Sequence, residues 1–288
     1  MPVNRAYSVE VTTSFGPDDP RTLLDRSGYE LVVDERFEDP ALDERLWVPR
    51  YLPQWTTEGA SAARYEVGAG RLVLRIDDDQ PAWSPEYTGE LRVSSFQTGV
   101  FSGPEGSGIG QHRWRDGLVV REAQPPLRLY TPTYGLFELR ARFSDDPTTM
   151  AALWMIGYED EPERSAEICI VEIFGRNVGT DATGIGMGVH PFHDPMIQDA
   201  FETVSVAIDA REAHGYAAEW TPERVAFYVD DRLVKVVQES PTYPMQFMLD
   251  IFEFRDGELA AGAGPYPKTF VVESFRGYRP VDGAVAGA

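Results

Sequence analysis

The sequence predicts an all-β fold, a two-sheet antiparallel jelly-roll sandwich, and three observations favour it. The 22 prolines and 26 glycines interrupt the chain of 288 residues so often that long amphipathic helices are excluded almost everywhere. Short runs rich in Val, Ile, Phe, Tyr and Trp lie between these breakers, as is typical of strands. Turn residues separate several neighbouring runs closely enough for antiparallel pairing, and more than ten such strands indicate two packed sheets.

The expected strands follow one another along the chain, with turn residues between them. Two connections are predicted to be tight hairpins, Gly68-Ala69-Gly70 and Asp230-Asp231, because each separates two apolar runs by very few residues. The expected strands are Tyr29–Asp34, Ala63–Val67, Arg71–Ile76, Gly89–Ser95, Gly135–Phe143, Met150–Met155, Ala166–Ile173, Ile185–His190, His214–Trp220, Arg224–Val229, Arg232–Val237, Met245–Phe252 and Phe270–Tyr278.

One long stretch, Gly99 to Pro126, is rich in glycine and only weakly periodic, so we expect a loop insertion there. This loop either borders one end of a groove or serves only as surface covering. The chain length suits one large domain. We place a single jelly-roll domain at residues 29–280, between an N-terminal extension of residues 1–28 and a flexible tail of residues 281–288.

Charge and cysteine content limit the partners and the compartment. The formal net charge of -21 disfavours binding to nucleic acid and to anionic membranes, although such a charge can also serve only to keep a protein in solution. The single cysteine, Cys169, excludes an intrachain disulfide and suits a reducing compartment. The first residues lack the apolar run of a secretory signal, and no run reaches the length of a membrane span. We therefore expect a cytoplasmic protein with a neutral partner.

The most informative segment, residues 166–175, resembles a strand with the wrong alternation of side chains. In a regular strand Glu172 would point to the same face as Ile168 and Ile170, towards the core. Burial of an unpaired carboxylate is costly. A β-bulge between Cys169 and Glu172 adds one residue and places Glu167, Cys169 and Glu172 on one face.

Two carboxyl groups on one face of a sheet are what a retaining glycosidase requires. Such enzymes hold the two groups roughly 5 Å apart, one as the nucleophile and the other as the general acid. The like charges raise one pKa and so separate the two roles. In the alternative interpretation, Glu172 only ends the strand at the surface and Glu167 is a solvated charge.

With these residues in view, the segment resembles glycoside hydrolase family 16, whose motif is Glu-x-Asp-x-x-Glu on a bulged strand. The resemblance implies a concanavalin A-like sandwich and a hydrolase of β-linked glucan or galactan, with Glu167 as nucleophile and Glu172 as acid/base. Segments that resemble the family follow one another in the family's order from about Tyr29 to Tyr278. The other segments that resemble the family are residues 134–142, 152–155, 216–222, 227–230 and 271–278.

Cys169 is the one departure within the motif, because the family has an aspartate at this position. A thiol between two carboxylates stays protonated and offers a weak donor in place of a charge. We expect the loss of this like charge to lower the pKa of Glu172 relative to a chain that carries the family's aspartate, and so to shift activity towards acidic pH. Alternatively, Cys169 is only a small hydrophobic residue of the core.

The resemblance also suggests residues that contact the substrate. Trp154 resembles the family's sugar-stacking tryptophan. Ordinary core packing is the alternative, but Leu153 and Met155 can supply the core-facing side of the strand, which favours a groove position for Trp154. Four other residues are expected to contact the substrate. His190 is one, although a histidine without a role is the alternative, and Arg128, near the nucleophile, is another. Asp250 and Phe252, which share a face on one strand, are the other two.

We expect no metal and no cofactor. His190, His193 and Asp194 lie on a proline-containing loop without a defined face, which disfavours metal coordination. The family can bind calcium away from the groove, and the sequence neither shows nor excludes such a site.

Two other functions compete with the hydrolase. A saccharide-binding, lectin-like protein would keep the groove after catalysis has weakened through Cys169. A structural or protein-interaction sandwich would have its groove filled by the Gly99–Pro126 segment and would bind no sugar. The retention of both glutamates favours the enzyme.

Overall fold

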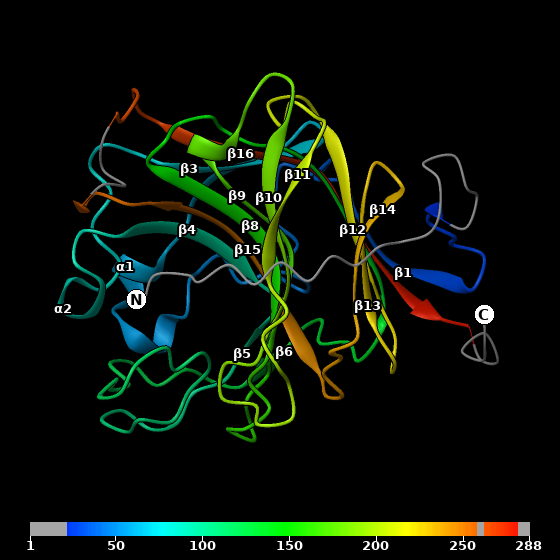
Figure 1. Cartoon of the computed structure of the whole chain (residues 1–288). Helices are drawn as coiled ribbons and strands as arrows, with labels where there is room; N and C mark the ends of the chain where they lie inside the picture. The colour runs from blue at the N-terminus through cyan, green and yellow to red at the C-terminus, as the bar shows by residue number, and fades with distance from the viewer. Residues whose placement is uncertain (1–21, 258–261, 282–288) are drawn as a thin grey trace.

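The computed structural model describes residues 22–257 and 262–281, and these form two packed antiparallel sheets (Figure 1). The fold class predicted from the sequence is confirmed. The eight-stranded sheet has the order β14-β13-β12-β7-β16-β3-β2, with β1 also paired to β16. Its strands are β1 (Tyr29–Glu35), β2 (Arg64–Gly68), β3 (Arg71–Ile76), β7 (Gly135–Arg142), β12 (His214–Trp220), β13 (Val225–Val229), β14 (Arg232–Val237) and β16 (Lys268–Pro280).

The six-stranded sheet carries the residues of the motif. Its order is β11-β10-β9-β8-β15-β4. Short elements lie outside the two sheets: the pair β5 (Gly99–Val100) and β6 (Leu127–Arg128), and the helical turns η2 (Pro53–Trp55), α1 (Glu58–Ser61), α2 (Pro85–Thr88) and η3 (Gly175–Asn177). The strands of the six-stranded sheet are β4 (Arg92–Gln97), β8 (Thr149–Gly157), β9 (Glu167–Phe174), β10 (Thr183–His190), β11 (Glu202–Val206) and β15 (Met245–Glu253).

Both predicted hairpins are present. Asp230 and Asp231 join β13 to β14 with φ of 48° and 63°, and Ala69 and Gly70 join β2 to β3 with φ of 54° and 79°. Two consecutive residues with positive φ give the turn whose twist matches that of paired strands. The register of these hairpins therefore follows from their turns.

Several predicted strand boundaries differ from the structure by a few residues, and some strands were not predicted. The strand expected at Gly89–Ser95 begins at Arg92, because α2 ends at Thr88 and the next residue, Gly89, has a φ of 62° that breaks the extended conformation. The sequence reading missed β11, since its alternating Glu, Thr and Ser side chains look like a loop. Among the described strands β11 pairs with β10 alone, so it is an edge strand that needs few apolar residues.

Three apolar clusters are buried in the described part of the chain, and two of them lie on opposite faces of the six-stranded sheet. The larger cluster fills the space between the sheets and contains Leu153, Met155 and the stacked ring pair Tyr130 and Phe247. The second cluster, which we call the outer cluster, covers the other face. Its buried members are Tyr51, Leu52, Trp55, Trp83, Val93, Leu118, Val120, Ala152, Trp154, Ile156, Cys169, Met248 and Phe252.

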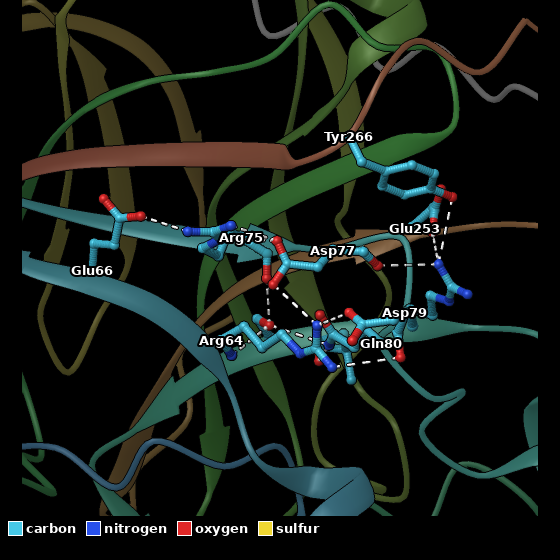
Figure 2. Close-up of polar contacts among 11 residues, drawn as sticks. Arg64, Glu66, Arg75, Asp77, Asp79, Gln80, Glu253 and Tyr266 are labelled. Carbon is cyan, nitrogen blue, oxygen red and sulfur yellow. Dashed lines mark hydrogen bonds and ion pairs between the residues drawn. The ribbon is translucent and has the colours of Figure 1, made fainter.

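Polar contacts close the sandwich along the edge formed by β2, β3 and β4 (Figure 2). Asp77 accepts hydrogen bonds from Arg64 and Arg75, at 3.1 and 2.9 Å, and these hold the pKa of its carboxyl below the usual value against the effect of burial. Gln80 donates to the backbone oxygen of Val93 at 2.8 Å. The segment after β3 is thereby fixed to β4 of the other sheet.

Residues before β1 also pack on the eight-stranded sheet. The backbone N–H of Leu24 donates to the oxygen of Asp231 at 2.9 Å, and the Leu24 side chain is buried. The rest of the predicted N-terminal extension, residues 1–21, and most of the predicted tail, residues 282–288, lie outside the described residues. No helix in the described part of the chain combines the length and the apolar composition that a membrane crossing requires.

Candidate active site

A β-bulge in β9 sets the direction of every side chain in the motif. Leu153 of β8 pairs with Val171, whereas the next residue, Trp154, pairs with Cys169, so Ile170 has no partner on β8. The pairing with β10 shifts at the same place. The predicted bulge is confirmed. Side chains of β9 that enter the core between the sheets are Ile168, Ile170, Val171 and Ile173.

Glycines on β10 make room beside the bulge. A Cβ atom on Gly186 would lie 3.3 Å from Cβ of Glu172 and 2.6 Å from the ring of Phe201. Gly188 has a φ of 142°, and a Cβ there would lie 2.3 Å from the backbone oxygen of Ala200. Larger residues at these two positions would therefore displace Glu172 or the chain that covers β10.

Glu167 and Glu172 differ in their surroundings although both leave β9 on the outer face. Glu167 is 9% exposed, and Glu172 is partly exposed. Burial, and to a smaller extent the charge of Glu167, raises the pKa of Glu172 to about 7. The structure thus places beside Glu167 a carboxyl group that holds its proton up to neutral pH, which is the arrangement that combined acid/base and nucleophilic chemistry requires.

Cys169 lies between the two glutamates and belongs to the outer cluster. It is 4% exposed. Burial first, and then the charges of Glu167 and Glu172, raise the pKa of the thiol well above its usual value. The side chain is therefore a neutral thiol at the place where the family motif has a carboxylate.

Trp154 lies next to Cys169, on the outer face as predicted, with Leu153 and Met155 in the core on the opposite side. Its indole N–H donates to Asp250, which is fully buried. Burial raises the pKa of Asp250 to about 7, and the neighbouring Ser95 and Trp154 oppose this rise. Asp250 therefore fixes the orientation of the indole.

The expectation that Asp250 and Phe252 contact substrate directly is corrected by their burial. Parity places both on the outer face, as predicted, but Phe252 is 6% exposed and its ring packs edge-on against Tyr51, with centroids 5.3 Å apart. The chain between β1 and β4 covers them. Asp250 is fully buried behind Trp154, and Phe252 packs within the outer cluster.

That Arg128 lies near the nucleophile stays a prediction, and the contacts that its side chain makes are with other residues. Its guanidinium pairs with Asp160 and lies 3.7 Å from the ring centroid of Tyr158. Among the described residues it makes no ion pair with Glu167 or Glu172. β6 pairs with β5, outside both sheets, and the Arg128 side chain is exposed.

His190 ends β10 directly opposite Glu167. Its Nδ1 is 3.1 Å from a carboxylate oxygen of Asp199, and its ring stacks on Phe201 with centroids 4.4 Å apart. His193 and Asp194 do not join it, because His193 Nε2 bonds the backbone oxygen of Arg113 and Asp194 accepts from Tyr243. His190 is thus the histidine of this loop that faces the motif.

The Gly99–Pro126 loop borders the site, and sequence reasoning did not identify the residue that it contributes. His112 Nδ1 lies 3.2 Å from Glu167 Oε1, although it makes no hydrogen bond there. The ring stacks on Phe192 and meets Trp154 edge-on, with centroids 4.6 and 5.2 Å apart. The loop is held in place at Gln111, whose backbone oxygen accepts from the indole of Trp55 at 2.8 Å.

Glu159 is a second residue that the sequence did not reveal. It is 3% exposed, and one carboxylate oxygen accepts from the backbone N–H of His112 at 2.5 Å while the other has no partner. Burial raises the pKa of Glu159 to about 8. Its contact with the loop spans 47 positions of sequence, so no local pattern could have predicted it.

Comparison with known proteins agrees with this geometry. Residues 130–263 match the model of glycosyl hydrolases family 16. A beta-glucanase of Rhodothermus marinus is 32% identical over 107 residues, which are 35% of this chain and 36% of that protein. An endo-1,3-1,4-beta-glycanase of Rhizobium meliloti (strain 1021) is 30% identical over 105 residues, which are 36% of this chain and 21% of that protein. The chain thus matches about a third or less of the length of these curated relatives.

Solved structures extend the similarity over most of the chain. A GlcNAcα1-4Gal releasing endo-β-galactosidase from Clostridium perfringens superposes with a TM-score of 0.78 at 30% identity, over 90% of this chain and 65% of that one. The laminarinase from Rhodothermus marinus superposes with a TM-score of 0.59 at 23% identity, over 88% and 98% of the two chains, which shows the shared fold. The resemblance predicted from the motif is confirmed.

Proposed function

We propose that this chain, a relative of glycoside hydrolase family 16 in sequence and fold, is a retaining glycoside hydrolase that acts on β-linked glycans. The observation that carries the proposal is the pair of glutamates that the bulge of β9 places on one face, one of them with its pKa raised to about 7. Two adjacent carboxyl groups, one of which keeps its proton near neutral pH, support double displacement at a sugar.

In the first step, Glu167 attacks the anomeric carbon and forms an ester with the sugar, while Glu172 gives its proton to the departing glycosidic oxygen. In the second step, the Glu172 carboxylate takes a proton from water, and that water attacks the same carbon and releases Glu167. The proton returns to Glu172 and the configuration at carbon is retained. The neutral thiol of Cys169 adds no charge to either step.

The substrate class that we propose is a β-galactoside-containing glycan. The galactosidase superposes more closely than the laminarinase, with TM-scores of 0.78 and 0.59, and at a higher identity. The side of the site that stays partly exposed contains Glu172, His190 and Phe201. An aromatic ring beside a carboxyl group and an imidazole suits a sugar ring, whose C–H face packs on an aromatic ring while its hydroxyls bond the polar groups.

A panel of substrates tests the sugar. We expect reducing ends to be released from β-galactans and short aryl β-galactosides at higher kcat/KM than from β-glucans. Glu167→Gln should abolish release, whereas Glu161→Gln, which changes an exposed glutamate on the connection between β8 and β9, should not. A higher kcat/KM on β-glucans would contradict the galactoside proposal while leaving the hydrolase intact.

A saccharide-binding protein without catalysis is the competing function. Calorimetry that detects saccharide binding, together with no release from any glycan, would replace the hydrolase by this lectin-like alternative. The cytoplasmic location stays a prediction, and cell fractionation with an antibody to the chain tests it.

A further inference from the structure

Three potential metal ligands meet beside the bulge. One donor atom each from Glu167, Cys169 and His190 lies within 4.8 Å of the other two. The sheet register creates this arrangement, because Cys169 follows Glu167 by two positions on β9 and His190 lies opposite Glu167 on β10. These three residues come from two adjacent, paired strands, so their backbone positions are fixed before any ligand binds.

The chemistry of the three donors suits a thiophilic cation. Zn²⁺ binds carboxylate oxygen, thiolate sulfur and imidazole nitrogen at about 2.0–2.3 Å, in tetrahedral geometry. Such bonds bring the donor atoms to about 3.3–3.8 Å from one another. Binding therefore requires the three side chains to rotate until their donor atoms, now within 4.8 Å of one another, reach this range. An aspartate in place of Cys169 would offer only hard oxygen, so the cysteine selects for softer cations.

The surroundings of the histidines add a second, independent observation. Asp199 is a hydrogen-bond acceptor at Nδ1 of His190, so the neutral ring carries its free lone pair on Nε2. A carboxylate behind a histidine is the usual support of a metal ligand. His112 Nδ1 is buried, has no hydrogen bond and lies 3.2 Å from Glu167 Oε1, which makes it a candidate fourth donor.

We propose that Glu167, Cys169 and His190, with His112 as a fourth donor, bind one Zn²⁺ or similar thiophilic divalent cation. Binding forms a metal–sulfur bond and releases the thiol proton of Cys169 to solvent. The metal site stands without the proposed hydrolase. Only its consequence rests on that function: a cation held by Glu167 withdraws the lone pair needed for attack on the sugar, so the cation inhibits.

The test is titration of the metal-free full chain with ZnCl₂ by calorimetry and with CoCl₂ by absorption spectroscopy. We expect one ion per chain and a thiolate-to-cobalt charge-transfer band. Cys169→Ala should remove the band, and His190→Ala should weaken Zn²⁺ binding at least tenfold. His193→Ala, a histidine of the same loop that bonds a backbone oxygen, is the matched control and should bind normally. Asp199→Asn should weaken binding by about 10- to 100-fold.

Two results would overturn the site. The first is Zn²⁺ affinity unchanged in both Cys169→Ala and His190→Ala. The second is a cobalt complex without the thiolate band. Circular dichroism checks that each variant is folded, and Cys169→Ser replaces Cys169→Ala if the latter does not fold. Stoichiometric Zn²⁺ binding through these ligands, by a chain that cleaves no glycan even when it is metal-free, would support the metal site and contradict the hydrolase, so the two proposals fail separately.

Discussion

Glu159→Gln measures how strongly the protein interior beside the site favours a protonated carboxyl group. Burial raises the pKa of Glu159 to about 8, from an ordinary value of 4.5. Glutamine keeps the side-chain length and the oxygen that accepts the N–H of His112, but it cannot ionise. The backbone φ of 58° at this position is the same strain for both residues. The variant therefore isolates the contribution that protonation of Glu159 makes to the pH dependence of stability.

The expected magnitude follows from linkage. Between the unfolded and folded pKa values, the folded state holds a proton that the unfolded state has lost, so wild-type stability falls as pH rises. A full proton difference corresponds to about 1.4 kcal/mol per pH unit. From about pH 5 to about pH 7, the free energy of unfolding of Glu159→Gln should gain roughly 3 kcal/mol relative to the wild type. Any constant effect of the extra amide hydrogens cancels in this comparison.

Urea unfolding of both proteins at several pH values, followed by tryptophan fluorescence, provides the data. Glu161→Gln is the control, because its side chain is exposed. Parallel curves for wild type and Glu159→Gln across this pH range would show that Glu159 is ionised in the folded state, and would refute the assignment of a buried protonated carboxyl.

Three further predictions concern the site and the strands that surround it. Cys169→Asp adds a like charge and raises the pKa of Glu172 above the present value of about 7, so the basic limb of kcat/KM moves to higher pH; superimposable profiles would refute this. Asp250→Ala leaves a buried indole N–H without its acceptor and should cost about 1–3 kcal/mol in urea unfolding, while Asp250→Asn should cost less. Gly188 has a φ of 142°, and the Cβ atom of Gly188→Ala would lie 2.3 Å from a backbone oxygen, so this variant should lower the free energy of unfolding by on the order of 3 kcal/mol. Gly184→Ala should change it by about 1 kcal/mol or less, and equal effects of the two variants would contradict backbone strain at Gly188.

Local patterns predicted much of the fold and the centre of the site. The bulge could be inferred because a regular strand would have buried Glu172 in the core, and a misplaced carboxylate is a strong local signal. The hairpin at Asp230 and Asp231 could be inferred from two apolar runs separated by residues that accept positive φ. In both cases the residues that give the signal lie within one short segment of the sequence.

Contacts between distant segments could not be predicted in this way. The approach of His112 to Glu167 and the contact of Glu159 with His112 depend on how a long loop folds back over β8 and β9. The contacts of Arg128 could not be predicted for the same reason, because its direction follows from the pairing of β5 with β6, two strands of two residues each. Asp250 was placed on the right face, but its burial depends on the chain that covers that face.

The most direct test of the account is covalent trapping of the nucleophile. The folded protein is incubated with a mechanism-based fluoro-sugar that carries an activated leaving group, and the labelled peptide is identified by mass spectrometry. The account predicts one sugar per chain, attached to Glu167, and no label in Glu167→Gln. Label on another residue would contradict the assignment of the nucleophile, and reversible binding without any label would contradict the retaining mechanism.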